Sequence, residues 1–363
     1  MKGAVLYEFG SPLVIDDIEV DPPQEGEVLV RVAASGVCHS DLHAVQGIHP
    51  PPLPVILGHE GAGIVEEVGE NVHHVRPGDH VILSWLPYCG KCRFCSAGRP
   101  GLCDDLAWSD AGTMMDGTTR FHRGDLRILH NTASTFAELT VVPAQTAISV
   151  DPSLPLAELA LLGCAVMTGV GAVLNTARVR PGETVAIVGC GGVGLNIVQG
   201  AVIAGAEVII AVDVMPEKLE LARSLGATHT VNASDGAVKQ AVHETVPGGV
   251  HYSFEALGRP ETIQTAISLI GKGGKAVLVG MAPPDARIAL DALSMTYQEQ
   301  SIMGSWYGSC RPSVDFPRLL ELYQDGKLEL KSLVTRTCKL EEVNEAFDAM
   351  ERGEVARTVI VYG

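Results

Sequence analysis

Short runs of apolar residues separated by turn residues dominate the first part of the chain. Such runs occur at 28–32, 64–68 and 80–83 and are rich in Val, Ile and Leu. Glycine, proline and aspartate stand between them, and runs bounded in this way are typical of β-strands. The pattern therefore predicts a β-rich region up to about residue 165. Within it, the polar, Gly- and Asp-rich stretch 104–132 predicts a long surface excursion.

The pattern changes after about residue 165. A continuous apolar strand is predicted at 184–188, followed by a helical stretch, a second strand at 207–212 and a helix at 217–225. The alternation continues with strands at 250–256 and 276–279. Strands that alternate with helices predict a parallel sheet, so this part of the chain is expected to be an α/β domain.

The tail from about residue 305 predicts two helices and a last strand. The helices are expected near 317–323 and 341–351, and the strand at 358–362. The longest apolar run, 159–174, is too short to span a bilayer and contains glycines and a threonine, so it predicts a buried segment. The apolar run at the N-terminus is too short for a signal peptide, and the cytoplasm is the expected location.

Composition and charge narrow the class of protein. The chain has 363 residues, of which 46% are hydrophobic and 19% charged. These values are typical of a globular protein long enough for two domains. The net charge of −17 disfavours nucleic acid and anionic membrane surfaces as partners.

Four of the nine cysteines form a compact cluster: Cys89, Cys92, Cys95 and Cys103. Two tight C-x-x-C turns and one longer loop suit a single tetrahedral zinc ion. Four thiolates leave no position for a substrate, so this zinc is expected to stabilise a surface lobe and not to take part in a reaction. Disulfides or free thiols are the alternative, and zinc is favoured because the rest of the chain has an intracellular character.

A glycine-rich turn follows the predicted strand 184–188. The segment 189–194 reads G-C-G-G-V-G and opens a helical stretch, which is the context required of a dinucleotide-binding motif. The first glycine permits the tight turn, the second admits a pyrophosphate and the third lets helix and strand pack closely. The start of the helix offers free N–H groups to phosphates. The residues expected to bind the cofactor here are Gly189, Gly191, Gly192, Val193 and Gly194.

Asp213 lies at the end of the next predicted strand. A carboxylate at this place can accept both hydroxyls of an adenosine ribose and would repel a 2′-phosphate, which favours NAD over NADP. No arginine follows Asp213 directly, and Lys218 is close enough to touch the ribose. A turn residue at a strand end is the alternative interpretation of Asp213.

Several motifs along nearly the whole chain match those of one family. They are G-V-C-H-S-D at 36–41, G-H-E-G-A-G at 58–63, the cysteine cluster, Gly163-Cys164 with Thr168-Gly169, the glycine turn and F-E-A-L-G at 254–258. Together they resemble the zinc-dependent alcohol dehydrogenases of the medium-chain dehydrogenase/reductase superfamily. Residues 115–121 resemble the animal and plant-type branch, which includes glutathione-dependent formaldehyde enzymes.

The resemblance implies a two-domain α/β architecture. A GroES-like, β-rich catalytic domain is expected at 1–165 and 306–363, with the zinc lobe at about 89–103. A Rossmann domain with a doubly wound parallel sheet is expected at 166–305 and would bind NAD.

The resemblance also implies a second, catalytic zinc. Cys38, His59 and Cys164 would be its ligands, and three protein ligands leave one position for water or substrate. Glu60 would be the carboxylate that approaches the metal during ligand exchange, and Asp41 would orient His59 through its other ring nitrogen. Taken singly, each ligand has a plain alternative as a buried cysteine or a surface histidine.

The family likewise implies a proton path and further cofactor contacts. Ser40 would take the proton of the alcohol, and His43 would pass it to water by way of the nicotinamide ribose; a simple loop histidine is the alternative for His43. Thr168 and Arg357 match cofactor-contacting positions, Arg357 against phosphate. His39 stands where many relatives have arginine against the pyrophosphate, and a weaker or pH-dependent grip on the cofactor is the resulting hypothesis.

The implied substrate pocket departs from the usual one. Trp85 matches a position that is often phenylalanine beside the reacting carbon, and Trp306 one that is usually aliphatic. Phe136 matches an aromatic wall, and His49 replaces a common aliphatic residue. Bulky indoles would narrow the pocket, so primary alcohols, including aromatic or allylic ones, are expected as substrates. The alternative is that both tryptophans are simply core residues.

The expected activity is reversible hydride transfer between a primary alcohol and NAD, giving the aldehyde, with two zinc ions per chain. Oxidation of a thiol adduct of formaldehyde and an enzyme with permanently bound NAD remain open. A non-catalytic NAD-binding relative and a zinc-free reductase are also considered, but the complete set of ligands argues against both. Relatives join through edge strands, so 276–304 is the candidate interface of a homodimer or homotetramer.

Overall fold

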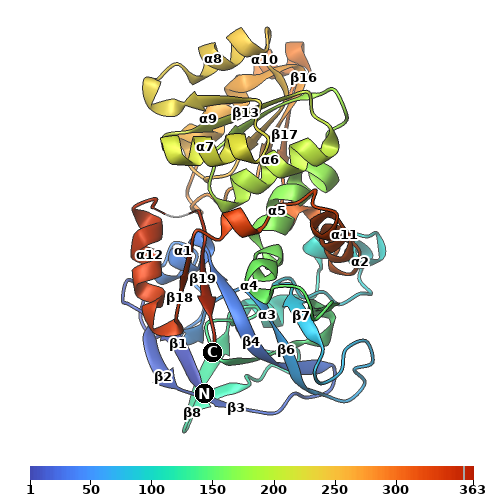
Figure 1. Ribbon diagram of the computed structural model, residues 1–363, viewed down its shortest axis with the longest axis vertical. Coiled ribbons are helices and arrows are strands. Elements are labelled where there is room, and N and C mark those ends of the chain that lie inside the picture. Colours follow the sequence, from blue (N-terminus) through green and yellow to red (C-terminus); the bar gives the residue numbers. More distant parts are fainter. Residues whose placement is uncertain (355) are drawn as a thin grey trace. The chain divides into compact units, whose positions relative to one another are not determined.

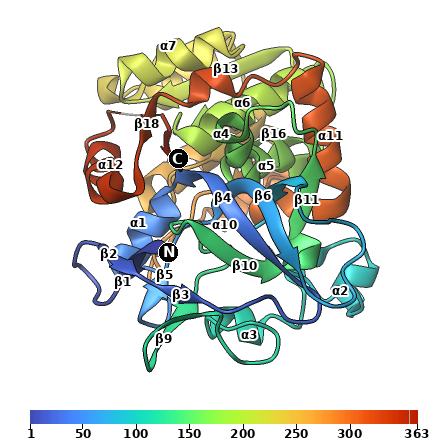
Figure 2. The same ribbon diagram turned by 60° about the horizontal axis from the view of Figure 1, so that its bottom comes forward.

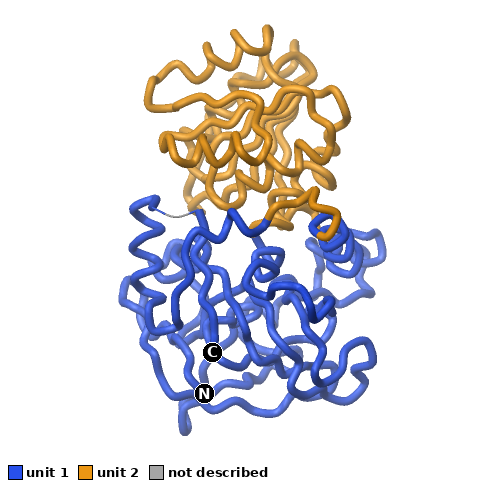
Figure 3. The backbone as a smooth tube through the Cα atoms, viewed as in Figure 1, with its two compact units in different colours: residues 1–164, 311–323, 330–363 blue, residues 165–310, 324–329 orange. Residues whose placement is uncertain are grey.

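The computed structural model describes residues 1–354 and 356–363, and they form two compact units (Figure 3). The first unit comprises 1–164, 311–323 and 330–363, and the second 165–310 and 324–329. The expected catalytic domain included residues 306–310, which belong here to the second unit, as does the short return at 324–329.

Two sheets form the first unit (Figure 1). The six-stranded sheet has the order β2-β1-β5-β9-β8-β3, and the seven-stranded sheet has the order β11-β7-β6-β4-β19-β18 with β10 paired to β4. The strands are β1 (Lys2–Leu6), β2 (Val14–Asp17), β3 (Glu19–Val20), β4 (Glu27–Val37), β5 (Val55–Ile56), β6 (Glu60–Val68), β7 (His80–Leu83), β8 (Phe121–Arg123), β9 (Leu126–His130), β10 (Leu139–Pro143), β11 (Ala147–Val150), β18 (Arg336–Cys338) and β19 (Thr358–Val361).

The centre of the seven-stranded sheet is the long pair β4 and β6, which run side by side with β10 in Figure 2. Alternate residues of these strands, such as Val28 and Val30 on β4, point into a buried apolar cluster, as expected for strands with one face on a core. Short helices lie around the sheets: α1 (His39–Val45), α2 (Arg93–Ser96), α3 (Ala107–Asp110), α4 (Leu156–Leu159), α11 (Pro312–Gln324) and α12 (Val343–Glu351).

The stretch 104–132 is only partly the surface excursion that its composition predicts. It supplies strands β8 and β9 to the six-stranded sheet, and Phe121 and Ile128 are completely buried. Arg120 is also buried, because its guanidinium forms two hydrogen bonds with the carboxylate of Glu27, at 2.7 and 2.8 Å. This distant partner, which lies on β4, ties the polar stretch into the fold.

The second unit is a parallel α/β domain. Its six strands have the order β14-β13-β12-β15-β16-β17, and every adjacent pair is parallel. The strands are β12 (Thr184–Val188), β13 (Val208–Asp213), β14 (His229–Asn232), β15 (Val250–Glu255), β16 (Ile270–Leu278) and β17 (Ser301–Gly304). The helices are α5 (Ala165–Gly171), continued by a π-helical turn at Ala172–Ala177, α6 (Gly192–Ala204), α7 (Pro216–Ser224), α8 (Val238–Thr245), α9 (Pro260–Leu269) and α10 (Ala292–Gln298).

The order of the strands reverses between β12 and β15. Chain connections run outward from β12 to β13 and β14, and then from β15 to β16 and β17. Helices α6 and α7 contact one another, and so do α8 and α9, as right-handed crossovers on opposite faces of a sheet require. Ligands of open α/β sheets bind at the carboxyl ends of the strands where the order reverses.

The apolar run 159–174 is buried, as predicted. In the part of the chain that the structure describes, no single helix is both long and apolar enough to cross a membrane. The successive helical segments Leu156–Gly163 and Ala165–Ala177 reach that length only when they are counted together, and a buried core segment meets the same criterion.

Candidate active site and metal centres

The pairing of β4 with β6 brings two of the expected zinc ligands together. Gly36, near the end of β4, pairs with Glu60, the first residue of β6. Cys38 follows the end of β4 and His59 precedes β6, so the register of this one pair places them side by side. A side chain on Gly36 would collide with the carboxylate of Glu60 and force that buried group to move, so glycine leaves the carboxylate its place.

The third expected ligand, Cys164, reaches the same place through a close contact. It follows a 3-10 turn at Ala160–Gly163 that lies against β6 and β7. A Cβ on Gly163 would lie 2.8 Å from the carbonyl oxygen of Leu83 and 3.3 Å from the Cα of Glu60. The absence of a side chain at Gly163 therefore lets this turn approach the ends of both strands.

The result is a compact set of four buried groups. Donor atoms of Cys38, His59, Glu60 and Cys164 all lie within 4.8 Å of one another. A hydrogen bond from the Cys164 thiol, with the charges of Arg357 and His59, holds the pKa of Cys38 well below its ordinary value despite burial. Two sulfurs and one imidazole are donors that zinc prefers, so the residues present fit a zinc ion with room for one further ligand.

Asp41 fixes the geometry around His59. Its Oδ1 accepts hydrogen bonds from Nδ1–H of His59 and from the backbone N–H of Gly58, both at 3.0 Å, and its Oδ2 accepts one from the N–H of Cys38 at 3.3 Å. Burial disfavours charge on His59, but the negative charges of Asp41 and Cys38 raise its pKa well above the ordinary value. Asp41 thus orients the ring through Nδ1, as a carboxylate beside a metal-binding histidine does.

Glu60 and Arg357 form an ion pair inside the first unit. Nη2 of Arg357 lies 2.8 Å from Oε1 of Glu60, and both side chains are buried. Arg357 also donates to the carbonyl oxygen of Val37 at 3.2 Å and lies 3.7 Å from Sγ of Cys38. Burial raises the pKa of Glu60, while the charge of Arg357, 2.8 Å away, opposes this rise and favours the ionised carboxylate. The structure therefore places Arg357 against Cys38 and Glu60 of the expected zinc site, and its contact with phosphate stays a prediction.

The residues of the expected proton path lie on α1, directly after Cys38. Oγ of Ser40 is 3.9 Å from Sγ of Cys38. The ring of His43 lies between two other imidazoles, with centroid distances of 6.4 Å to His39 and 5.8 Å to His49. Their roles stay predictions, but α1 brings His39, Ser40 and His43 to one end of β4, and His49 comes from the loop that follows the helix.

The expected pocket residues are placed differently from one another. Trp85 packs its ring edge-on against the imidazole of His59, with 6.4 Å between centroids, so it lies beside an expected zinc ligand. Phe136 has no exposed surface and packs against Phe347 in the core of the first unit. Its ring also lies against Gly58, the residue before His59, and its expected role as a pocket wall stays a prediction. Trp306 is 43% exposed and belongs to the second unit.

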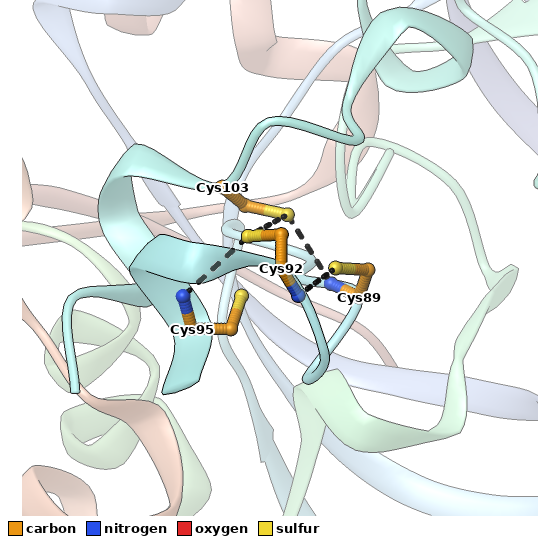
Figure 4. A group of neighbouring side chains, drawn as sticks. All are labelled: Cys89, Cys92, Cys95 and Cys103. Carbon is orange, nitrogen blue, oxygen red and sulfur yellow. Dashed lines mark hydrogen bonds between the residues drawn. The ribbon is translucent and has the colours of Figure 1, made fainter. Parts of the chain in front are cut away.

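The four clustered cysteines also converge. Figure 4 shows their sulfurs turned toward a common point, and all four lie within 4.8 Å of one another. Backbone N–H groups surround them, and hydrogen bonds from the N–H groups of Cys95 and Asp104 lower the pKa of Cys92 to about 6. All four are free of disulfides. Four thiols held in this way fit the closed zinc site that their spacing predicts.

The glycine turn of the second unit has the conformation that its sequence predicts. Gly189 has a φ of +96°, which side chains rarely adopt, and its N–H donates to Val212 at 2.8 Å. Gly191 caps α6, and a Cβ there would have no neighbour within 4 Å. Gly194 lies directly against Gly189. The turn therefore leaves the start of α6 open on the side from which a pyrophosphate can approach its N–H groups.

Asp213 ends β13 next to this turn. Its two carboxylate oxygens accept hydrogen bonds from the N–H groups of Cys190, at 2.7 Å, and Met215, at 3.0 Å. Lys218 follows on α7. Thr168 lies on α5. The next residue, Gly169, packs directly against the first turn of α6, so α5 is held close to the glycine turn. These placements fit a dinucleotide, although contact with it is a prediction for each residue.

Sequence reasoning missed the structural role of Arg357 and of the small residues Gly36 and Gly163. A signal for Arg357 existed, because a glutamate at the start of an apolar strand needs a buried cation near it. For the two glycines the sequence held no local signal, because the atoms they avoid come from distant segments.

The comparisons with known proteins agree with this geometry. The model of the alcohol dehydrogenase GroES-like domain matches residues 24–152, and that of the zinc-binding dehydrogenases matches residues 192–325. An NDMA-dependent alcohol dehydrogenase of Amycolatopsis methanolica is 41% identical, over 99% of this chain and 98% of its own length. An S-(hydroxymethyl)glutathione dehydrogenase of Synechocystis is 42% identical, over 99% of both chains.

A solved structure carries the same likeness. The crystal structure of benzyl alcohol dehydrogenase from Acinetobacter calcoaceticus superposes with a TM-score of 0.95 and 33% sequence identity, and the match covers 100% of this chain and 99% of that one. Both the sequence and the fold thus match over their full length. The chain belongs to the zinc-dependent alcohol dehydrogenases of the medium-chain dehydrogenase/reductase superfamily.

Proposed function

We propose that this protein is an NAD-dependent alcohol dehydrogenase that oxidises primary alcohols to aldehydes and also catalyses the reverse reaction. The observation that carries the proposal is the convergence of Cys38, His59 and Cys164, which are remote in sequence, at one buried point. Zinc held by these three residues would lower the pKa of a bound alcohol and polarise a bound aldehyde, and NAD would accept or return the hydride.

The protein groups around this point would prepare and remove the proton. Asp41 keeps the ring of His59 oriented, and Arg357 neutralises Glu60 at the base of the site. Oγ of Ser40 would accept the hydroxyl proton of the alcohol. The imidazole of His43 would pass that proton toward water, because its ordinary pKa near 6.5 lets it bind and release a proton near neutral pH.

Asp213 supports NAD over NADP as the preferred cofactor. Its carboxylate ends β13 beside the glycine turn. A carboxylate there can accept the ribose hydroxyls of NAD and would repel the 2′-phosphate of NADP. We also expect each chain to hold a second, structural zinc at Cys89, Cys92, Cys95 and Cys103. Association through the edge of the second unit's sheet, residues 276–304, remains our proposal for a homodimer or homotetramer.

Trp85 supports small or flat primary alcohols as substrates. Its indole lies against His59, so a branched secondary alcohol bound there would meet it. The names of two relatives suggest two variants of this reaction. One relative is named as dependent on NDMA and another as acting on S-(hydroxymethyl)glutathione, so a permanently bound cofactor and a thiol-adduct substrate are candidates for this chain too.

A substrate panel on protein of measured zinc content would test the proposal. Primary, aromatic, allylic and branched alcohols would be assayed with NAD and with NADP, and formaldehyde with and without glutathione. We expect turnover of primary alcohols with NAD. Turnover only with glutathione would favour the thiol adduct, and turnover only with an added acceptor such as NDMA would favour bound cofactor. No turnover by protein that carries two zinc ions would refute the proposal.

A further inference from the structure

Glu255, the last residue of β15, is a completely buried carboxylate that holds a turn. Its Oε1 accepts three hydrogen bonds: from the N–H of Leu257 at 2.9 Å, the N–H of Gly258 at 2.8 Å and Oγ1 of Thr262 at 2.7 Å. Its Oε2 has no hydrogen-bond partner among residues 1–354 and 356–363. These three hydrogen bonds tie the buried carboxyl group of Glu255 to turn 256–259 and to Thr262 on α9.

The turn 256–259 is also held from its other side. The backbone carbonyl of Glu255 accepts hydrogen bonds from Val279, at 2.9 Å, and Gly280, at 3.0 Å. A side chain on Gly280 would collide with the backbone of the turn, and one on Gly258 would collide with the carbonyl of Met281. The turn is thus packed tightly at the carboxyl edge of the sheet. Glu255 holds it in position through hydrogen bonds of its side chain and of its backbone carbonyl.

What the turn presents is Leu257, which lies over the first glycine of the cofactor motif. A Cβ on Gly189 would be 2.6 Å from Cγ of Leu257 and 3.1 Å from both of its methyl carbons. Leucine at this place is nevertheless 43% exposed. β12 and β15, which carry these two residues to the edge, are the neighbours between which the strand order reverses. An exposed leucine here gains free energy when a ligand in the turn covers it.

We propose that Glu255 is a positioning residue for the dinucleotide: its carboxylate holds turn 256–259 so that the side chain of Leu257 packs on the cofactor bound at Gly189. This inference rests on the proposed function, in which the glycine turn binds NAD. Glu255 acts only through Leu257 and touches no reacting atom.

A double-mutant cycle tests this coupling. NADH affinity would be measured by calorimetric titration, and thermal stability in parallel, for the parent, Leu257→Ala, Glu255→Gln and the double variant. Loss of an apolar contact of this size predicts about tenfold weaker binding for Leu257→Ala. Glu255→Gln, which replaces the carboxyl group by a weaker acceptor, should weaken binding at least about threefold and by no more than about tenfold. The double variant should bind within about twofold of Leu257→Ala, because the two residues act through one contact.

Thr262→Val is the matched control. It removes one hydrogen bond to Glu255 but leaves both backbone bonds of the turn, so NADH affinity should stay within about twofold of the parent even where thermal stability falls. If Glu255→Gln does not fold, Glu255→Asp replaces it in the cycle, since the shorter carboxylate keeps the charge and withdraws from the turn.

Three results would overturn the inference. They are unchanged affinity in the Glu255 variant, effects of the two substitutions that simply multiply, and an equal loss of affinity in Thr262→Val. Each of these presupposes that the parent binds NADH and so leaves the proposed function standing. A parent that carries no bound dinucleotide and binds neither NADH nor NADPH would refute both.

Discussion

The guanidinium of Arg357 and the carboxylate of Glu60 are joined by a buried ion pair, with 2.8 Å between Nη2 and Oε1, at the base of the expected zinc site. Arg357 comes from the segment that precedes the last strand, whereas Glu60 begins β6. The pair therefore ties the C-terminal part of the chain to the strand that carries His59. It also places a permanent positive charge next to Cys38, which favours the thiolate that a metal needs.

Loss of this charge should be costly. Arg357→Met leaves Glu60 buried without its partner, and breaking a buried pair from one side costs about 3–5 kcal/mol in the free energy of unfolding. Urea unfolding of the zinc-loaded protein would measure it. Arg352→Met is the control, because Arg352 pairs with Glu354 on the surface, where an ion pair contributes little. Equal stability of the two variants would contradict the prediction.

The local elements could be predicted from the sequence because their signals are local. The apolar runs at 184–188 and 80–83 coincide with β12 and β7, and the glycine turn lies between strand and helix as its spacing indicates. The four cysteines likewise converge as predicted, because three short spacings leave little freedom for their arrangement.

What depends on distant segments could not be predicted in this way. Cys38, His59 and Cys164 were joined by family resemblance alone. The register of Gly36 with Glu60 brings the first two together, and the close approach of the turn at Gly163 brings in Cys164. Strand register is decided by pairing across the sheet, which no short stretch of sequence reports.

Burial was equally hard to predict from composition. Phe136 is completely buried, because it packs on Phe347 of α12, and its expected place in the pocket wall stays a prediction. Arg120 lies in the stretch 104–132, which was expected as a surface excursion, and is buried with its partner Glu27. In both cases the deciding neighbour is far away in the sequence.

His130 should make the stability of the protein depend on pH. It is buried, its Nε2 accepts a hydrogen bond from the N–H of Arg120 at 3.1 Å, and burial, together with the charge of Arg120, lowers its pKa to about 3. The unfolded chain takes up a proton below pH 6.5, whereas the folded protein does not until about pH 3. The free energy of unfolding should therefore fall as the pH falls through this window, by about 2–3 kcal/mol between pH 6.5 and 4.5.

His130→Gln isolates this contribution, because its amide oxygen can accept the same hydrogen bond and has no proton to gain in this range. Urea unfolding at a series of pH values would compare the variant with the parent, and contributions of other groups cancel in the difference. The stability of the variant should depend less steeply on pH below 6.5. Parallel curves for the two proteins would show that His130 is not responsible.

The cysteine lobe should hold its own zinc ion. Cys103→Ser removes one of four ligands from a closed site, so we expect the zinc content to fall from two ions to one per chain and the melting temperature to fall with it. Elemental analysis and calorimetry measure both. Cys190→Ala, at a buried cysteine outside both clusters, should keep two ions per chain. Retention of both ions by Cys103→Ser would contradict the assignment of this site.

His39 should limit the grip on the cofactor if it faces the pyrophosphate, as the family resemblance implies. It is the first residue of α1 and is exposed. His39→Arg replaces a partly charged ring by a permanent charge, so NADH should bind a few-fold more tightly above pH 7, and its affinity should vary less with pH. Gln46→Arg adds the same charge at the end of the same helix and should leave affinity unchanged. Identical pH profiles for His39→Arg and the parent would reject the hypothesis.

Trp85 should restrict the size of the alcohol. Its indole packs on the ring of His59, so Trp85→Ala opens space directly beside the expected metal ligands. We expect kcat/KM for branched secondary alcohols to rise about tenfold relative to that for small primary ones, because the variant relieves a steric penalty of about 1.4 kcal/mol in the transition state. Trp108→Ala removes an indole from the polar stretch 104–132, where its Nε1–H donates to the carbonyl oxygen of Asp105, and should leave the ranking of substrates intact. If Trp85→Ala also keeps the ranking of the parent, Trp85 is a core residue and the size of the pocket is set elsewhere.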